Sequence, residues 1–314
     1  MFKATILPYI RIARPDHWFK NVFMLPGMAF AIYDSPHLLG SDIVVPLFLG
    51  VFATCLVASS NYTLNEILDA PMDALHPVKK LRPIPSGQVN LPIAYIEFGT
   101  LGISGLMIGL IINKWFFISL LMLQIMGLLY NVPPIRLKDR PYFDVLSESI
   151  NNPLRLFLGW FIIISSYPPT LSLIMAYWMI GAFFMTVKRY GEYQRIADKE
   201  TAINYRKSFK HYNPYYLILS MVYYGSAFGM FFGIFIIRYR IELLLSVPFI
   251  AGFIPVYMRL AFWEDSPAQY PEKLYKQRGL VIYTSFCMLM TLCLLFIDIP
   301  ILEKAFAPYH LPGE

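Results

Sequence analysis

Long apolar segments recur along this chain and restrict its fold more than any motif does. They lie near residues 21–34, 43–65, 91–112, 115–131, 145–166, 170–188, 215–237, 242–262 and 279–297. Most of them approach the roughly 20 residues that a helix needs to cross about 30 Å of hydrocarbon, and the first is short. The stretch from Thr5 to Ile12, just before it, is expected to lie on the membrane surface as an amphipathic entry helix.

Charged residues are scarce as well. The chain is 57% apolar and 15% charged, whereas about a quarter of the residues of a soluble domain are charged. We therefore predict an all-α fold, a polytopic membrane protein of about nine transmembrane helices. No linker or shift in composition divides residues 1–314, so a single intramembrane domain is expected, with 1–20 as its entry segment. The three cysteines fall in predicted helices and indicate neither a disulfide framework nor a zinc site.

Basic residues are distributed unevenly between the connecting segments. Of the 26 Lys and Arg residues, 21 lie in segments 1–20, 66–90, 132–144, 188–212 and 259–279. By the positive-inside rule, these segments and the N-terminus are expected on the cytoplasmic side of an inner membrane, with the C-terminus outside. The net charge of +6 is then a consequence of topology, and no nucleic-acid partner is implied. Segments 66–90, 132–144 and 188–212 are the expected active-site loops.

The first polar motif follows the second apolar segment. Asn65, Asp69 and Asp73 are spaced i, i+4, i+8, so they share one face if the helix continues past Pro71. Together with Glu66 they offer the oxygen ligands that Mg²⁺ takes alongside substrate phosphates. A basic cluster follows directly, and in it Lys79 and Arg82 are candidates for phosphate binding. Asn65, Glu66, Asp69 and Asp73 are thus the candidate catalytic residues, and Glu66, Asp69 and Asp73 the candidate metal ligands.

The second polar motif contains Lys138 and a stripe on the following segment. If one helix begins near Phe143, five polar residues share a face at i, i+3, i+4, i+7 and i+11: Asp144, Ser147, Glu148, Asn151 and Arg155. An arginine three turns into an apolar helix is costly, so Arg155 is expected to face a cavity or a partner. One interpretation is a structural pair with Glu148 or Asp144. The other is an active site, in which Lys138, Asp144, Asn151 and Arg155 bind substrate.

The third polar motif ends the sixth long apolar segment. Lys188, Glu192 and Arg195 share a helix face at i, i+4 and i+7, and Arg189 lies beside them. Basic residues are expected at any cytoplasmic helix end. The motif is therefore either a set of topology charges or, with Lys188, Arg189 and Glu192, part of a substrate site.

These motifs together resemble the UbiA superfamily of intramembrane prenyltransferases. Residues 65–73 are similar to its Asn-Asp-x-x-Asp-x-x-x-Asp signature, with Glu66 in the second position. The chain most resembles the branch of decaprenyl-phosphate phosphoribosyltransferases, through motifs that extend over nearly its whole length. They are Arg14-Pro15-x-x-Trp18-x-Lys20-Asn21, His76-Pro77-x-Lys79-x-x-Arg82-Pro83, Arg136-Leu137-Lys138, Asp144, Arg155 and Lys188-Arg189-Tyr190-x-Glu192. The resemblance implies a UbiA-like bundle with an active-site cavity on its cytoplasmic side.

Within the superfamily, typical prenyltransferases carry a second Asp-rich motif where this chain has Lys188 and Arg189. Phosphoribosyl diphosphate carries an additional 5-phosphate, which fixed cations suit better than a second carboxylate pair. The resemblance thus implies Mg²⁺-dependent transfer of 5-phosphoribosyl from phosphoribosyl diphosphate to a polyprenyl phosphate in the bilayer, for use in cell-envelope synthesis. In this scheme Lys20 or Arg155 orients the lipid phosphate, and Asp144 contacts the ribose or a second Mg²⁺.

Two alternatives remain open from the sequence. One is ordinary prenyl transfer, in which the same metal site ionises a polyprenyl diphosphate and an aromatic or lipid acceptor attacks. The other is a transporter or a non-catalytic scaffold with an anion vestibule. The sequence gives no visible inverted repeat and no glycine-interrupted helix at mid-membrane depth, which are the features typical of transporters. It does not indicate an oligomeric state.

Overall fold

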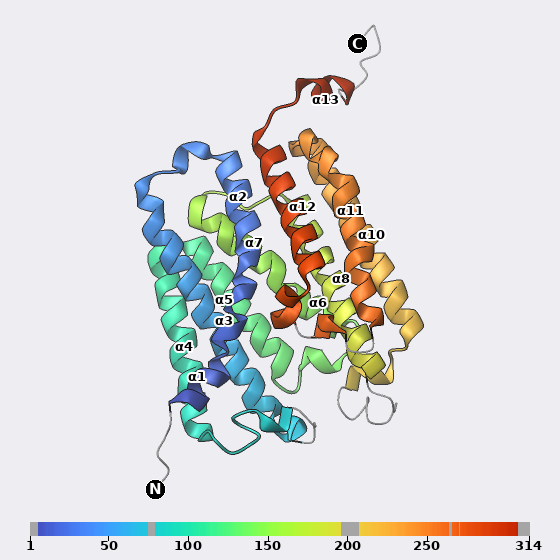
Figure 1. The fold of residues 1–314 in the computed structure, drawn as a ribbon. Coiled ribbons are helices and arrows are strands. Elements are labelled where there is room, and N and C mark those ends of the chain that lie inside the picture. Colours follow the sequence, from blue (N-terminus) through green and yellow to red (C-terminus); the bar gives the residue numbers. More distant parts are fainter. Residues whose placement is uncertain (1–5, 75–78, 196–206, 264–265, 270, 307–314) are drawn as a thin grey trace.

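A computed structural model describes residues 6–74, 79–195, 207–263, 266–269 and 271–306. The described residues form helices and connecting loops, without a strand, so the predicted all-α class is confirmed. Figure 1 shows a bundle of long helices, with α1 (Leu7–Ala13) at one end and α13 (Pro300–Ala305) at the other. His76 and Pro77, which belong to one motif of the resemblance, lie outside the described residues.

Seven helices of the described chain are long and apolar enough to cross a membrane. They are α3 (Val44–Asp73), α4 (Leu91–Ile112), α5 (Lys114–Asn131), α8 (Leu171–Arg195), α10 (Pro214–Tyr239), the Ile241–Phe262 helix that contains α11 (Val247–Arg259), and α12 (Arg278–Phe296). Asparagine side chains cap three of them: Asn90 begins α4, Asn113 begins α5 and Asn213 begins α10, each accepting a backbone N–H of the first turn.

The other two predicted spans differ from expectation, so the count of nine is not confirmed. Residues 15–34 form a 3₁₀ helix, η1 (Pro15–Met24), followed by α2 (Leu25–Asp34). Residues 143–163 form α6 (Phe143–Ser149) and α7 (Asn151–Ile163), which are separated at Ile150. Proline explains the second break, because the ring of Pro153 would clash with the carbonyl of Ser149 in a continuous helix. The prediction of one continuous helix with a single polar stripe was therefore wrong.

Two glycines bring α2 and α7 unusually close together. A Cβ on Gly27 would lie 2.1 Å from the carbonyl oxygen of Leu156, and one on Gly159 would lie 2.0 Å from that of Met24. Neither position has room for a side chain. Since α2 follows η1 and α7 follows α6, this contact fixes two polar segments relative to each other at the α1 end of the bundle.

Candidate active site

A polar cavity of about 200 Å³ lies among the helix ends at the α1 end of the bundle. Seven cationic side chains and three carboxylates line it: Arg14, Lys20, Lys79, Arg82, Lys138, Arg155 and Lys188, with Asp69, Glu148 and Glu192. Asn61, Tyr62, Asn65, Tyr130, Asn131 and Asn151 also line it. The three polar motifs of the sequence therefore meet at one place, and the excess of cations suits a ligand with several phosphate groups.

Helix α3 reaches this cavity intact. It continues through Pro71 to Asp73, so the condition for Asp69 and Asp73 to lie on one helix is met. Asp69 accepts from Lys138 Nζ at 2.5 Å and from Arg136 Nη2 at 2.9 Å through Oδ1, and from the Asn65 amide at 3.1 Å through Oδ2. The Asn65 amide also donates to Asn131 Oδ1 at 2.6 Å. Asp69 is thus a cavity carboxylate held between cations and amides.

Asp73 and Glu66 do not line the polar cavity. Asp73 binds Arg82 Nη1 at 2.5 Å, with Lys79 Nζ at 3.9 Å. Glu66 is 1% exposed, lies 3.5 Å from Arg14 Nη2 and accepts from the backbone N–H of Ile84 at 3.2 Å. Each acid of the predicted metal set thus has a cation of its own.

Within the described residues, no three His, Cys, Asp or Glu side chains come close enough to hold a metal ion. The predicted set of Asp69, Asp73 and Glu66 is therefore not assembled. What Asp69 offers is one carboxylate beside the amide groups of Asn65 and Asn131. That donor set fits Mg²⁺, which keeps several waters and uses one or two carboxylates together with substrate phosphate oxygens.

Two cations reach α3 from left-handed backbone positions. Arg14, with φ of +50°, and Arg136, with φ of +31°, are non-glycine residues in this region, which costs conformational energy and is often found at functional sites. Arg14 contacts Glu66, and Arg136 contacts Asp69. Burial lowers the pKa of Arg14, and the nearby Arg82 lowers it further. The two arginines with a strained backbone are therefore the ones that contact acids in the last turns of α3.

Arg189 is the centre of a buried ionic cluster between α6 and α8. It is fully buried and donates to Asp144, Glu148 and Glu192, each at 2.9 Å. Asp144 is also fully buried and accepts from Tyr212 at 2.6 Å. Neither Arg189 nor Asp144 lines the polar cavity, although both were predicted to bind substrate. We call Arg189, Asp144, Glu148 and Glu192 the Arg189 cluster.

Lys188, Glu148 and Glu192 connect this cluster to the cavity. Burial alone would raise the pKa of Glu148, but Lys188 and Arg189 lower it well below its usual value. Lys188 Nζ lies 3.8 Å from Glu148 Oε1. Glu148 is therefore an ionised group at the cavity wall, a position that the sequence motif did not assign to it.

Lys20 and Arg155 have a different environment. Arg155 Nε donates to Asn21 Oδ1 at 3.0 Å, and Arg155 is 6% exposed. Lys20 Nζ lies over the Tyr62 ring, 5.4 Å from its centroid. In the described part of the chain, no carboxylate lies within 4.0 Å of either cation. We call Lys20, Arg155, Tyr62 and Asn21 the Lys20–Arg155 group.

The suggested structural pair between Arg155 and Glu148 or Asp144 does not form. Both acids instead contact Arg189. The break at Ile150 separates the helix that carries the two acids from the helix that carries Arg155.

Ten of the fourteen residues predicted from sequence line the cavity: Lys20, Asn65, Asp69, Lys79, Arg82, Lys138, Asn151, Arg155, Lys188 and Glu192. Tyr62 and Glu148 were missed. A signal for Tyr62 was present, because it lies three residues before Asn65 and seven before Asp69, on the same helix face.

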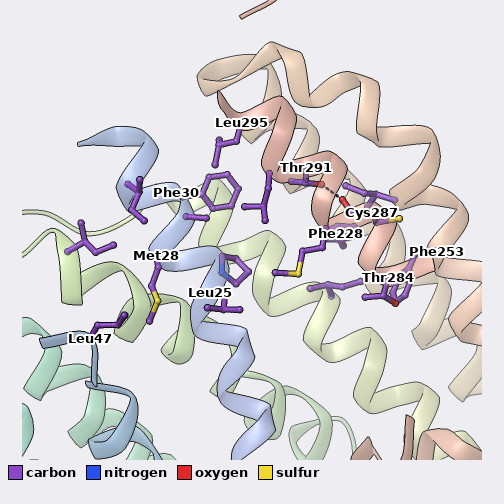
Figure 2. Close-up of a pocket in the computed structure, with 18 of the residues that line it drawn as sticks. Leu25, Met28, Phe30, Leu47, Phe228, Phe253, Thr284, Cys287, Thr291 and Leu295 are labelled. Carbon is purple, nitrogen blue, oxygen red and sulfur yellow. Dashed lines mark hydrogen bonds between the residues drawn. The ribbon is translucent and has the colours of Figure 1, made fainter. Parts of the chain in front are cut away.

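A second cavity, of about 570 Å³, is almost wholly apolar. Figure 2 shows residues of its wall, among them Leu25, Met28 and Phe30 of α2 and Thr284, Thr291 and Leu295 of α12. The Thr291 hydroxyl donates to the Cys287 carbonyl at 2.8 Å, so it is satisfied within its own helix. The polar and apolar cavities are lined by consecutive segments, since Lys20 in η1 borders the first and Leu25 in α2 the second.

Comparison with known families gives a match to the UbiA prenyltransferase family over residues 21–297. The decaprenyl-phosphate phosphoribosyltransferase of Mycolicibacterium smegmatis is 28% identical over 217 residues, which cover 68% of this chain and 65% of that protein. The protein of the same name from Corynebacterium glutamicum is 24% identical over 229 residues, covering 66% of this chain and 60% of that protein. The matched region is thus less than two thirds of the length of these relatives.

Solved structures resemble the fold. A UbiA homolog from Archaeoglobus fulgidus bound to GPP and Mg²⁺ superposes with a TM-score of 0.70 at 20% identity, covering 92% of this chain and all of that one. A structure of digeranylgeranylglyceryl phosphate synthase superposes with a TM-score of 0.63 at 14% identity, covering 92% of this chain and 96% of that one. The UbiA-like bundle expected from the motifs is therefore confirmed.

Proposed function

The chain belongs to the UbiA prenyltransferase family, and we propose that it is a transferase of 5-phosphoribosyl groups. The donor is phosphoribosyl diphosphate and the acceptor a polyprenyl monophosphate. An oxygen of the lipid phosphate bonds to C1 of the ribose, the bond from C1 to the diphosphate breaks, and diphosphate leaves. The relatives from M. smegmatis and C. glutamicum carry names that fit this reaction.

The observation that carries the proposal is the charge of the polar cavity. Its wall holds seven cations against three carboxylates, and two of the cations, Lys20 and Arg155, have no carboxylate within 4.0 Å among the described residues. A reaction that brings together a donor with three phosphate groups and an acceptor with one needs such an excess.

We assign the diphosphate to the end of the cavity formed by α3 and the loop after it. Lys79 and Arg82 would bind its oxygens, and Asp73, which contacts both cations, would position them. Asp69 would hold Mg²⁺, with Asn65 and Asn131 beside it. When bound there, Mg²⁺ acts as a Lewis acid that neutralises charge on the leaving group. Lys138 contacts Asp69 and would bind the same phosphates.

Lys188 is the proposed ligand of the 5-phosphate, because it lines the cavity while Arg189 does not. Arg189 would instead hold the cavity wall in place through its three carboxylates. Glu66 would position Arg14 in the same way. This division of roles replaces the prediction that adjacent basic residues share one phosphate.

The acceptor phosphate is assigned to the Lys20–Arg155 group, with its lipid tail in the apolar cavity (Figure 2). A phosphate monoester is mostly ionised at neutral pH, so it attacks without a strong general base. His17 would be a poor one, because burial and Lys20 lower its pKa to about 2. The cavity of about 570 Å³ would hold the head-proximal part of the tail, and the rest would lie in the bilayer.

Seven apolar spans and the family together make this an integral membrane protein. For its orientation we propose that the α1 end, where the basic loops and the polar cavity lie, faces the cytoplasm, and that the C-terminus is outside. A soluble donor would then reach the cavity directly from the cytoplasm.

Prenyl transfer is the second candidate function. The large apolar cavity favours it, as do related folds solved with the prenyl diphosphates GPP and DMAPP together with Mg²⁺. It predicts consumption of a polyprenyl diphosphate and indifference to phosphoribosyl diphosphate.

A membrane assay with Mg²⁺, radiolabelled phosphoribosyl diphosphate and a polyprenyl monophosphate separates the two functions. We expect label to enter the organic phase, and Asp69→Asn to abolish its transfer. Asp42→Asn, near the opposite end of α3, is the matched control and should transfer normally. If polyprenyl diphosphate is consumed while the ribosyl label stays in water, the chain is a prenyltransferase and the proposal is wrong.

A further inference from the structure

The two carboxylate oxygens of Glu148 differ, because one accepts hydrogen bonds from the protein and the other does not. Its Oε2 accepts from the Tyr130 hydroxyl at 2.8 Å and from Arg189 Nη2 at 2.9 Å. Its Oε1 has Lys188 Nζ at 3.8 Å, beyond hydrogen-bond distance, and no described residue donates to it. The side chain is 26% exposed and lines the polar cavity. A fixed carboxylate therefore presents an open acceptor to the cavity.

The carboxylate of Asp69 differs on this point. Both of its oxygens accept hydrogen bonds, Oδ1 from Arg136 and Lys138 and Oδ2 from Asn65. Arg136, Lys138 and Asn65 therefore already occupy the positions around Asp69 that a cation, or a metal ion bound to a phosphate, would take. Glu148 Oε1, in contrast, has acceptor capacity to spare, and an ionised carboxylate accepts hydrogen bonds without donating any.

The charge of Glu148 restricts what can bind there. Phosphate oxygens carry negative charge and are repelled by a carboxylate, so they should lie against the cations. A hydroxyl group suits the position, because it can donate to the carboxylate in a short, charge-assisted hydrogen bond. Arg189 and Tyr130 hold the acceptor in place before the ligand arrives, which reduces the ordering cost of binding.

We propose that Glu148 Oε1 accepts a hydrogen bond from a ribose hydroxyl of the donor and so selects a sugar diphosphate over a prenyl diphosphate. The inference rests on the proposed function and extends it to the sugar. The sequence assigned this role to Asp144, one helical turn earlier. Asp144 is fully buried and bound to Arg189, Tyr212 and Ser208, so the exposed carboxylate of the pair takes the role.

Donors that lack one hydroxyl test this contact. For the wild-type protein, kcat/KM with either the 2-deoxy or the 3-deoxy form of phosphoribosyl diphosphate should fall about ten-fold or more below that of the natural donor. Glu148→Gln removes the charge and keeps the size. It should show a similar fall with the natural donor and little further loss with the same deoxy donor.

Three controls keep the result interpretable. Glu303→Gln, on α13 at the opposite end of the bundle, should retain full discrimination between donors. Glu148→Asp keeps the charge on a shorter side chain and should retain part of it. Binding of inorganic diphosphate, which has no hydroxyl group to recognise, reports whether Glu148→Gln keeps a folded cavity, and it should be no weaker than in wild type.

Two results would overturn the inference alone. One is equal discrimination against both deoxy donors in wild type and Glu148→Gln. The other is a rise in the Mg²⁺ concentration for half-maximal activity in Glu148→Gln with discrimination unchanged, which would make Glu148 a metal ligand. If wild type does not use phosphoribosyl diphosphate at all, the proposed function fails, and the inference fails with it.

Discussion

Two sets of cations in this site differ in what surrounds them. Arg189 is fully buried and contacts three carboxylates. Arg155 is nearly as buried, but it donates hydrogen bonds to neutral groups, the side-chain oxygen of Asn21 and the backbone carbonyl of Asn151. A buried cation with carboxylate partners is already neutralised within the protein. A buried cation without them retains its charge for a ligand, and the position of Arg155 on the cavity wall gives the ligand access.

The comparison predicts its largest effect at Arg189. Arg189→Met should lower the free energy of unfolding by about 3–5 kcal/mol, because it leaves buried carboxylates without their cation. Thermal unfolding in detergent measures this. Lys188→Met is the matched control on the next residue and should be much milder, since Lys188 is partly exposed and lies 3.8 Å from its acid. If the two variants were equally stable, the structural role assigned to Arg189 would be wrong.

Arg155 should respond in the opposite way. Arg155→Met should unfold near the wild-type temperature, because no carboxylate loses its partner, while KM for the polyprenyl monophosphate rises about ten-fold or more. Steady-state kinetics at saturating phosphoribosyl diphosphate measure the change. A loss of stability as large as that of Arg189→Met, with KM unaltered, would mean that the two cations have the same role.

His17 provides a smaller effect that depends on pH. Burial and Lys20 lower its pKa to about 2 in the folded protein, below an unfolded value of about 6.5. The unfolded chain therefore takes up the proton first as pH falls. The contribution of His17 to stability is complete above about pH 6.5 and is lost progressively below it.

Between pH 7 and pH 5 we expect wild type to lose about 2 kcal/mol more stability than His17→Gln. Unfolding temperatures of both proteins at the two pH values measure the difference. A bound polyanion should shrink it, because added negative charge offsets Lys20 and raises the pKa of His17. Parallel pH profiles for the two proteins would show that burial and Lys20 do not lower the pKa of His17.

Much of the fold could be predicted from sequence because apolar length is a local property. The segments that became α3, α4, α5, α8, α10 and α12 are each continuous, and hydrocarbon thickness sets their length. The breaks at Met24 and Ile150 were missed, although Pro26 and Pro153 stood in the sequence. A proline permits a helix start or a kink, and only packing, such as that of Gly27 on Leu156, decides which forms.

The site was predicted as a list of residues better than as a set of contacts. Helical spacing was enough to place Asn65 and Asp69 together. It did not reveal that Asp73 pairs with Arg82 and that Glu66 pairs with Arg14. Those contacts join residues from different elements, and spacing along one helix contains no information about them. For the same reason Arg189 was predicted as a phosphate ligand, although two of its three carboxylate partners, Asp144 and Glu148, lie on α6.

Ligand stabilisation in two proteins tests most directly whether Arg155 binds the lipid phosphate. Thermal unfolding of wild type and Arg155→Met would be measured in detergent with and without a short-chain polyprenyl monophosphate, and with the matching polyprenol as the control that lacks the phosphate. We predict that the monophosphate raises the unfolding temperature of wild type, that Arg155→Met loses most of this rise, and that the alcohol has little effect on either. An equal rise in both proteins would contradict the claim that cations without a carboxylate partner bind the substrate phosphate.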